Sequence, residues 1–222
     1  MVNTDKPMKY DANRIIGTFG LERGTECEIL SHLMSVNGVL EPKYVDFLEE
    51  HRQSLIKFGD YWNEEELKMN FLAHIFYVAQ LHEPKKINVF YERTIKAELN
   101  GKKESVKCDC IVAKPFGIYD PQVPYFFLQV APSQPSPKGK EKKINEDAEG
   151  QMLLAMLIAQ KENNNDKPIY GCYLQGKNWV FTTLHQSNYC VSRQFDTSQK
   201  ADLEQVILIL RKLKSIILTD LI

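Results

Sequence analysis

Apolar residues recur every three or four positions in five parts of the chain, and this spacing predicts amphipathic helices. The five segments are 25–36, 42–58, 63–81, 146–162 and 201–218. The start of the third helix is the best marked, because Asn63 suits the N-cap position and Glu66, three residues later, completes a capping box. The stretches 13–24 and 132–143 have no such period and are predicted to be connecting segments.

Strands are predicted where apolar and polar residues alternate or where a short run is wholly apolar. These segments are 87–99, 102–113, 125–130, 169–174, 179–184 and 189–192. Asn100 and Gly101 separate the first two, and this dipeptide favours the type I′ turn of a two-residue hairpin. The apolar run 125–130 is typical of a strand that is buried on both faces inside a sheet.

Length, composition and charge limit the classes of protein to which the chain can belong. The chain has 222 residues, of which 43% are hydrophobic and 26% charged, so one well-buried globular core is expected. The net charge of −1 provides no overall attraction to polyanions, and contact with nucleic acid would need a local basic patch. Five cysteines without a CxxC pair fit neither a disulfide framework nor a zinc knuckle. With no apolar leader or membrane span in the sequence, we expect buried thiols and a cytoplasmic protein.

The Asn-Gly turn also sets the register of the predicted hairpin. It places Leu99 opposite Lys102, and counting back along the strands places Glu92 opposite Asp109. Two carboxylates that face each other in a sheet repel, so the pair needs a bound cation, a neighbouring lysine or solvent exposure. A bulge that separates the two residues is the remaining alternative.

The order of these elements resembles the core of the PD-(D/E)XK nuclease superfamily. More narrowly, the chain resembles uncharacterised Bacteroidetes-type proteins related to the nuclease domain of type I restriction subunits. The stretches that carry this resemblance are FYERT, CDCIVAK, PYFFLQVAP, EGQMLLAMLIAQ and PIYGCYLQGKNWVF. The resemblance implies an α/β fold of the restriction-endonuclease type, with a mixed β-sheet flanked by helices. It covers residues 63–222 as the core, with residues 1–62 as an N-terminal helical extension of the same continuous domain.

In active members of the superfamily, an Asp on the second strand and a Glu on the third hold a divalent cation. A Lys two residues after the Glu helps to position the attacking water. Asp109 matches the first position, but Gln129 and Ala131 stand at the other two. Because a neutral amide is a poor ligand for Mg²⁺ and a methyl group supplies no charge, we expect hydrolysis to be lost. The protein would then bind nucleic acid or a protein partner and need no cofactor.

An active divalent-metal DNA endonuclease with relocated residues is the first alternative. Lys107 shares a face of the predicted strand with Asp109 and could replace the missing lysine. Glu92, together with Glu64 or Glu66 of the preceding helix, could complete a Mg²⁺ or Mn²⁺ site around Asp109.

Other residues are candidates for contact with nucleic acid. Gln151 resembles a helix glutamine that helps to organise the site in some relatives, although a polar residue beside a helix start is an equal explanation. The segment with Lys138, Lys140, Lys142 and Lys143, together with Lys102 and Lys103, could form a patch that faces phosphates, or it could be a solvated basic loop.

The last predicted helix suggests a further alternative. Its Ile and Leu residues occupy more than one face, which would suit an assembly module that forms a homodimer.

Overall fold

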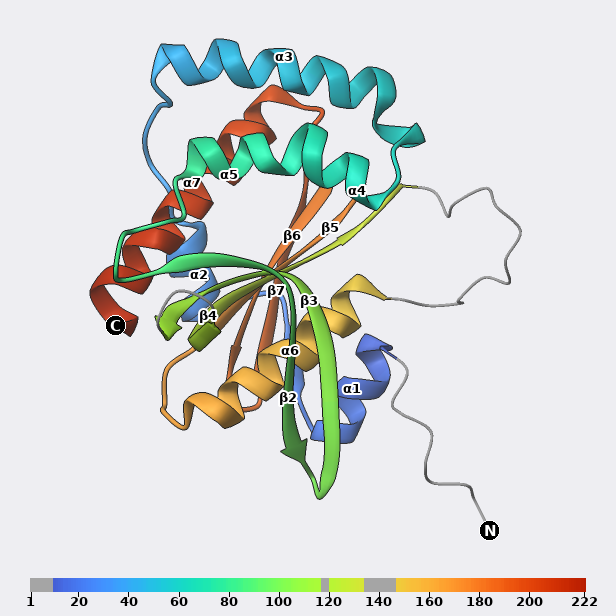
Figure 1. Cartoon of the computed structure of the whole chain (residues 1–222), viewed down its shortest axis with the longest axis vertical. Coiled ribbons are helices and arrows are strands. Elements are labelled where there is room, and N and C mark those ends of the chain that lie inside the picture. Colours follow the sequence, from blue (N-terminus) through green and yellow to red (C-terminus); the bar gives the residue numbers. More distant parts are fainter. Residues whose placement is uncertain (1–9, 117–119, 134–146) are drawn as a thin grey trace.

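The structure is a computed structural model that describes residues 10–116, 120–133 and 147–222 (Figure 1). Its helices are α1 (Ala12–Phe19), α2 (Glu28–Met34), α3 (Pro42–Phe58), α4 (Glu64–Leu67), α5 (Ala73–Ala79), α6 (Ala148–Asn163) and α7 (Lys200–Ile216). Its strands are β1 (Glu22–Gly24), β2 (Asn88–Leu99), β3 (Lys102–Phe116), β4 (Asp120–Ala131), β5 (Ile169–Gln175), β6 (Asn178–His185) and β7 (Asn188–Asp196). A 3₁₀ turn spans Gly59–Tyr61, and π-helical turns span Lys68–Leu72 and Ile217–Leu221.

The described strands form one mixed sheet in the order β1-β7-β6-β5-β4-β3-β2. The pairs β4 with β5 and β1 with β7 are parallel, and the remaining neighbours are antiparallel. Helix α6 makes the crossover between the parallel strands β4 and β5, as such a connection requires. The fold is therefore α/β with a mixed sheet flanked by helices, as the sequence predicts.

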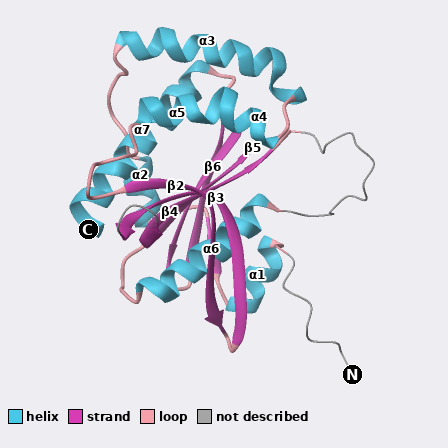
Figure 2. Ribbon diagram, viewed as in Figure 1, coloured by secondary structure: helices cyan, strands magenta, loops and turns pink. Residues whose placement is uncertain are grey.

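Helices cover both faces of the sheet (Figures 1 and 2). One face packs against α2, α3, α5 and α7, and the other packs against α6 and α1. Every residue of α6 from Met152 to Ala159 is buried, because this helix lies between the sheet, α1 and the β2–β3 hairpin. Two hydrophobic cores, one on each side of the sheet, hold the layers together.

The N-terminal part departs from the prediction. The stretch 13–24 was expected to be a connecting segment, but it contains most of α1 and all of β1, which pairs with β7. α1 carries local signals in its N-cap residue Asp11 and its left-handed C-cap residue Gly20, which the prediction missed. β1 has three residues and depends on β7 for backbone hydrogen bonds. Helix α2 begins at Glu28 rather than Thr25, and its N-cap residue Cys27 makes no side-chain cap.

Most apolar residues of helix α7 are buried within the chain. Its buried residues are Leu203, Val206, Ile207, Ile209, Leu210, Leu213 and Ile216. They belong to the core on the α5 side of the sheet, so the apolar faces that suggested a homodimer are covered within the chain. Among the described residues, no helix is both long enough and apolar enough to cross a membrane.

At the pair Glu92 and Asp109, the side chains of the β2–β3 hairpin switch from one face of the sheet to the other. Before it on β3, Val106 and Cys108 face the α6 core, whereas Cys110 faces the opposite core. The register is unchanged through this point, as the pairs Thr94 with Lys107 and Phe90 with Ile111 show. Glu92 has a left-handed backbone with φ of 55°, which resets the alternation on β2 without inserting a residue. The hairpin bends there, and its outer half extends along α6 (Figure 1).

Candidate functional site

The candidate site lies where β3 and β4 separate. Backbone pairing of these strands extends to Cys110 with Leu128 and stops there. Side chains bridge the gap beyond that pair: the amide of Asp109 donates to Oε1 of Gln129 at 2.7 Å. In return, the amide of Val130 donates to Oδ2 of Asp109 at 2.8 Å. The carboxylate of Asp109 is thus fixed on the edge of the gap, with its second oxygen directed away from β4.

Gln129 connects three elements. Besides accepting from the Asp109 amide, its Nε2 donates to the carbonyl oxygen of Lys107 at 2.9 Å and to Oε1 of Gln151 on α6 at 3.0 Å. The side chain is almost fully buried, so these bonds satisfy polar atoms that water does not reach. A carboxylate at this position could not make the two donor contacts. Gln129 therefore suits a structural bridge better than a ligand position.

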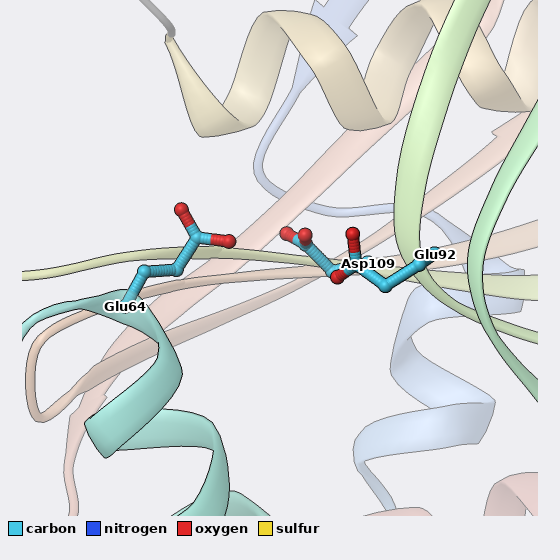
Figure 3. Close-up of side chains that lie close together, drawn as sticks. All are labelled: Glu64, Glu92 and Asp109. Atoms are coloured by element: carbon cyan, nitrogen blue, oxygen red, sulfur yellow. The ribbon is translucent and has the colours of Figure 1, made fainter.

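Three carboxylates converge beside this bridge. One oxygen from each of Glu64, Glu92 and Asp109 lies within 4.8 Å of the others. Figure 3 shows Glu64 reaching from α4 toward the two carboxylates of the hairpin. Because the residues come from α4, β2 and β3, the packing of α4 against the hairpin creates the cluster.

The ammonium group of Lys68 occupies the centre of this carboxylate cluster. Its Nζ donates to Oε1 of Glu64 at 2.6 Å and to Oε1 of Glu92 at 2.7 Å. A third bond of 2.8 Å goes to Oδ1 of Asp109. An ammonium group has three hydrogens, so one lysine satisfies one oxygen of each acid. The Lys68 side chain is only 14% exposed, which makes these ion pairs stronger than those on an open surface.

The start of α4 explains how Lys68 and Glu64 are placed. Asn63 and Glu66 form the predicted capping box, with bonds of 3.0 Å and 2.8 Å between side chains and backbone amides. Glu64 then lies in the first turn, and Lys68 follows it by one helical turn. The π-helical turn begins at Lys68, where the amide of Ala73 bonds to the Lys68 carbonyl oxygen five residues back.

Burial and charge oppose each other at Asp109. Burial raises the pKa of its carboxyl to about 6, although the bonds from Lys68 and the Val130 amide lower it and the charge of Glu64 raises it. For Lys68, burial lowers the pKa, but the bonds to Asp109, Glu64 and Glu92 outweigh it and hold the pKa above its usual value. The lysine therefore stays charged, and Asp109 takes up a proton more easily than an ordinary aspartate does.

Lys107 completes the charge pattern on the outer side of the cluster. Its ammonium group forms an ion pair with Glu92. For Glu92, burial raises the pKa, but the bonds from Lys107 and Lys68 leave it below the usual value. The three carboxylates of the cluster and these two ammonium groups leave one negative charge, and the exposed Glu65, 3.5 Å from Lys68 Nζ, adds another at its rim. The predicted repulsion between Glu92 and Asp109 is relieved by the neighbouring lysines.

The other residues singled out in the sequence lie as follows. Glu66 is engaged in the capping box and lies outside the carboxylate cluster. Gln151 joins the site through Gln129, and Ala131 ends β4. Lys138, Lys140, Lys142 and Lys143 lie outside the described residues.

A divalent cation does not fit the arrangement that the nuclease resemblance implies. That arrangement needs acidic oxygens at 109 and 129, yet the amide of Gln129 is already bonded to β3 and α6. A different donor set exists in Glu64, Glu92 and Asp109, but it surrounds a lysine. Binding of a metal ion there would require Lys68 to leave.

Sequence reasoning did not identify Lys68. Its one local signal is the spacing Glu64 to Lys68, which is common on solvated helix surfaces. The contacts that define its role are to residues 24 and 41 positions away in the sequence.

The candidate site is therefore defined by its geometry alone, since a search of protein-family models and a search of curated proteins gave no match to this chain.

Proposed function

We propose that this protein is a nuclease-like scaffold that binds nucleic acid without hydrolysing it. The observation that carries the proposal is the Lys68 ammonium group at the centre of the carboxylate cluster. An ammonium group neutralises the acids, but it cannot lower the pKa of a bound water or polarise a phosphoryl oxygen as Mg²⁺ does. The cluster is therefore an element of the fold in which lysines offset most of the negative charge of the acids.

The residues at the two altered positions support the loss of hydrolysis. Gln129 makes bonds that a glutamate could not make, and Ala131 provides no charge near the cluster. Restoring activity would therefore require more than one substitution.

The outer half of the hairpin supports contact with a polyanion. Its exposed face, which we name the hairpin face, consists of Thr94, Lys96, Glu98, Lys103, Ser105 and Lys107. Because Lys107 is paired with Glu92, the positive charge of this face comes from Lys96 and Lys103 against Glu98, although the whole chain carries −1. Such a local patch is the electrostatic requirement for binding phosphates.

A nuclease assay tests the first half of the proposal. Purified protein is incubated with plasmid and with single-stranded DNA in the presence of Mg²⁺ or Mn²⁺, beside the variants Asp109→Ala and Glu98→Ala. We expect no cleavage by any of the three. Cleavage by the wild type and by Glu98→Ala that disappears in Asp109→Ala would overturn the proposal.

A binding assay tests the second half. Fluorescence anisotropy with labelled single-stranded and duplex DNA should show binding that weakens as salt increases. Lys96→Gln and Lys103→Gln should each weaken it and reduce the salt slope by about one counterion. Lys161→Gln, which removes an exposed lysine on α6, is the charge-matched control. Equal affinity in all variants, or no binding at low salt, would contradict a role for the hairpin face and favour a protein partner.

A metal-dependent nuclease with relocated ligands is a second candidate. It is favoured by the convergence of Glu64, Glu92 and Asp109 within 4.8 Å, which is close enough for one cation to contact all three. In this candidate, Lys68 and Lys107 move aside and remain available to contact phosphate. Calorimetry with Mn²⁺ separates the two candidates, because binding that is lost in Asp109→Ala supports the nuclease and no heat of binding to the wild type excludes it.

A further inference from the structure

A second feature lies at the opposite edge of the sheet from the carboxylate cluster. A cavity of about 590 Å³ opens between β1, the start of α2 and the strands β6 and β7. Its lining includes Cys27 and Cys190, which are 163 positions apart in the sequence, together with Thr183 and Gly24. The binding function proposed above makes no use of this cavity.

The pairing of the strands brings the two thiols together. Cys190 on β7 lies opposite Gly24 of β1 on one side and opposite Thr183 of β6 on the other. A Cβ at Gly24 would lie 3.8 Å from the Cys190 sulfur, and Cys190, although buried, lines the cavity beside this glycine. The sulfur of Cys27 lies 3.6 Å from Oγ1 of Thr183. Both thiols therefore meet beside the Thr183 hydroxyl.

The five cysteines differ in access. Cys108, Cys110, Cys172 and Cys190 are buried, the first three of them in the two cores, whereas Cys27 is partly exposed. Burial raises the pKa of Cys190 to about 12, and the adjacent Cys27 thiol contributes to the rise. A reagent from solvent therefore meets Cys27 first, and Cys190 stands next to it as a protonated thiol.

We propose that Cys27 and Cys190 form a reversible disulfide by exchange with a low-molecular-weight disulfide that enters this cavity. The Cys27 thiol loses its proton to solvent, and its thiolate attacks one sulfur of the incoming disulfide. A mixed disulfide forms, and the first small thiolate leaves. Cys190 then loses its proton and attacks the Cys27 sulfur, which releases the second small thiolate. The protein loses two electrons and two protons, and the small disulfide is reduced to two thiols.

The disulfide would fasten β1 and the start of α2 to β7. β1 has three residues and pairs only with β7 in the described sheet, so this edge depends on few backbone bonds. A covalent link between positions so distant in sequence restricts the unfolded chain strongly. Oxidation should therefore raise the melting temperature.

The test uses the folded wild type with oxidised glutathione. Free thiols are alkylated after incubation, and peptides are mapped by mass spectrometry. We expect the loss of two of the five thiols, a linked peptide pair that contains Cys27 and Cys190, and a higher melting temperature that dithiothreitol reverses.

Single substitutions separate the two steps. Cys190→Ser should stop at a mixed disulfide on Cys27, whereas Cys27→Ser should lose no thiol. Cys172→Ala, which removes a buried cysteine outside the cavity, should still lose two. A wild type that keeps all five thiols, or that stays as the mixed disulfide with Cys190 alkylated, would overturn the proposal. Modification that spreads to Cys108, Cys110 and Cys172 would also contradict it, because it would report unfolding.

Discussion

At the scale of single residues, Lys68 is the centre of the candidate site. It bonds to acids from its own helix and from two strands, and it is mostly removed from solvent. A buried ion network of this kind stabilises only while it is complete, since loss of one member leaves charges without a partner. The stability of the protein should therefore respond strongly to this one side chain.

Lys68→Met should lower the free energy of unfolding by about 2 kcal/mol, below the usual cost of breaking a buried ion pair because Glu64 and Glu92 are 40% and 41% exposed. Urea denaturation measures the loss. Addition of Mn²⁺ should restore part of it in the variant, where the three acids are free to bind a cation, and should leave the wild type unchanged. Lys96→Met, which removes an exposed lysine from the hairpin face, is the control. Equal losses in the two variants would show that the network contributes nothing.

Asp109, to which Lys68 donates a hydrogen bond, should titrate at an unusual pH. Its folded-state pKa of about 6 lies above the ordinary 3.8, so the folded protein binds this proton more readily than the unfolded chain does. The contribution of Asp109 to stability is therefore greatest below pH 4 and declines as the pH rises through 6. Carboxyl-carbon NMR of Asp109 should show a midpoint near pH 6, and Lys68→Met should move that midpoint upward. A midpoint below 4 would contradict this balance of burial and charge.

The residue-level site was only partly predictable. The Asn-Gly turn gave the facing pair Glu92 and Asp109, and a neighbouring lysine was one of the explanations considered for it. The identity of that lysine depends on how α4 packs over the hairpin, and no local pattern encodes that packing. The bonds of Gln129 to β3 and α6 are equally tertiary in origin.

At the scale of elements, the bend in β2 positions the cluster. Glu92 adopts φ of 55°, a conformation that costs a residue with a Cβ about 1 kcal/mol. Its carboxylate bonds to Lys68 and Lys107 from this position. A strained backbone at a charged cluster is consistent with a conformation that the surrounding contacts impose.

The relative stability of glycine and alanine variants should therefore differ between two positions of β2, Glu92 and Glu98. Glu92→Gly and Glu92→Ala lose the same ion pairs, but only glycine relieves the left-handed backbone. We expect the glycine variant to be more stable by about 1 kcal/mol, as measured by thermal or urea unfolding. At Glu98, which lies in the same strand without a positive φ, alanine should be the more stable by about 0.5–1 kcal/mol. The same order at both positions would rule out strain at Glu92.

Except for α1, elements with strong local signals were predicted, and those that depend on neighbours were not. Pro42 and the capping box at Asn63 marked two helix starts correctly. β1 is three residues long and exists through its pairing with β7, so periodicity could not reveal it.

At the scale of the whole molecule, α7 belongs to the core. Its apolar side chains pack under α5 and against the sheet, so the chain needs no second copy to cover them. Stability should then be a property of the single chain.

Leu210→Ala tests this arrangement. Leu210 is fully buried, and its truncation should lower the free energy of unfolding by about 2–5 kcal/mol. The melting temperature of both proteins should not change over a wide range of protein concentration, because unfolding is not coupled to dissociation. A melting temperature that rises with concentration would instead support the homodimer.

The bend at Glu92 also has a bearing on solubility. β2 is the outermost strand on its side of the sheet, and a long straight outermost strand offers its backbone to other chains as a template for fibril growth. The left-handed residue interrupts that template partway along, and Lys96 and Glu98 place charges on the part that follows. The kink that gathers the acids around Lys68 thereby also discourages edge-to-edge stacking of one molecule on the next.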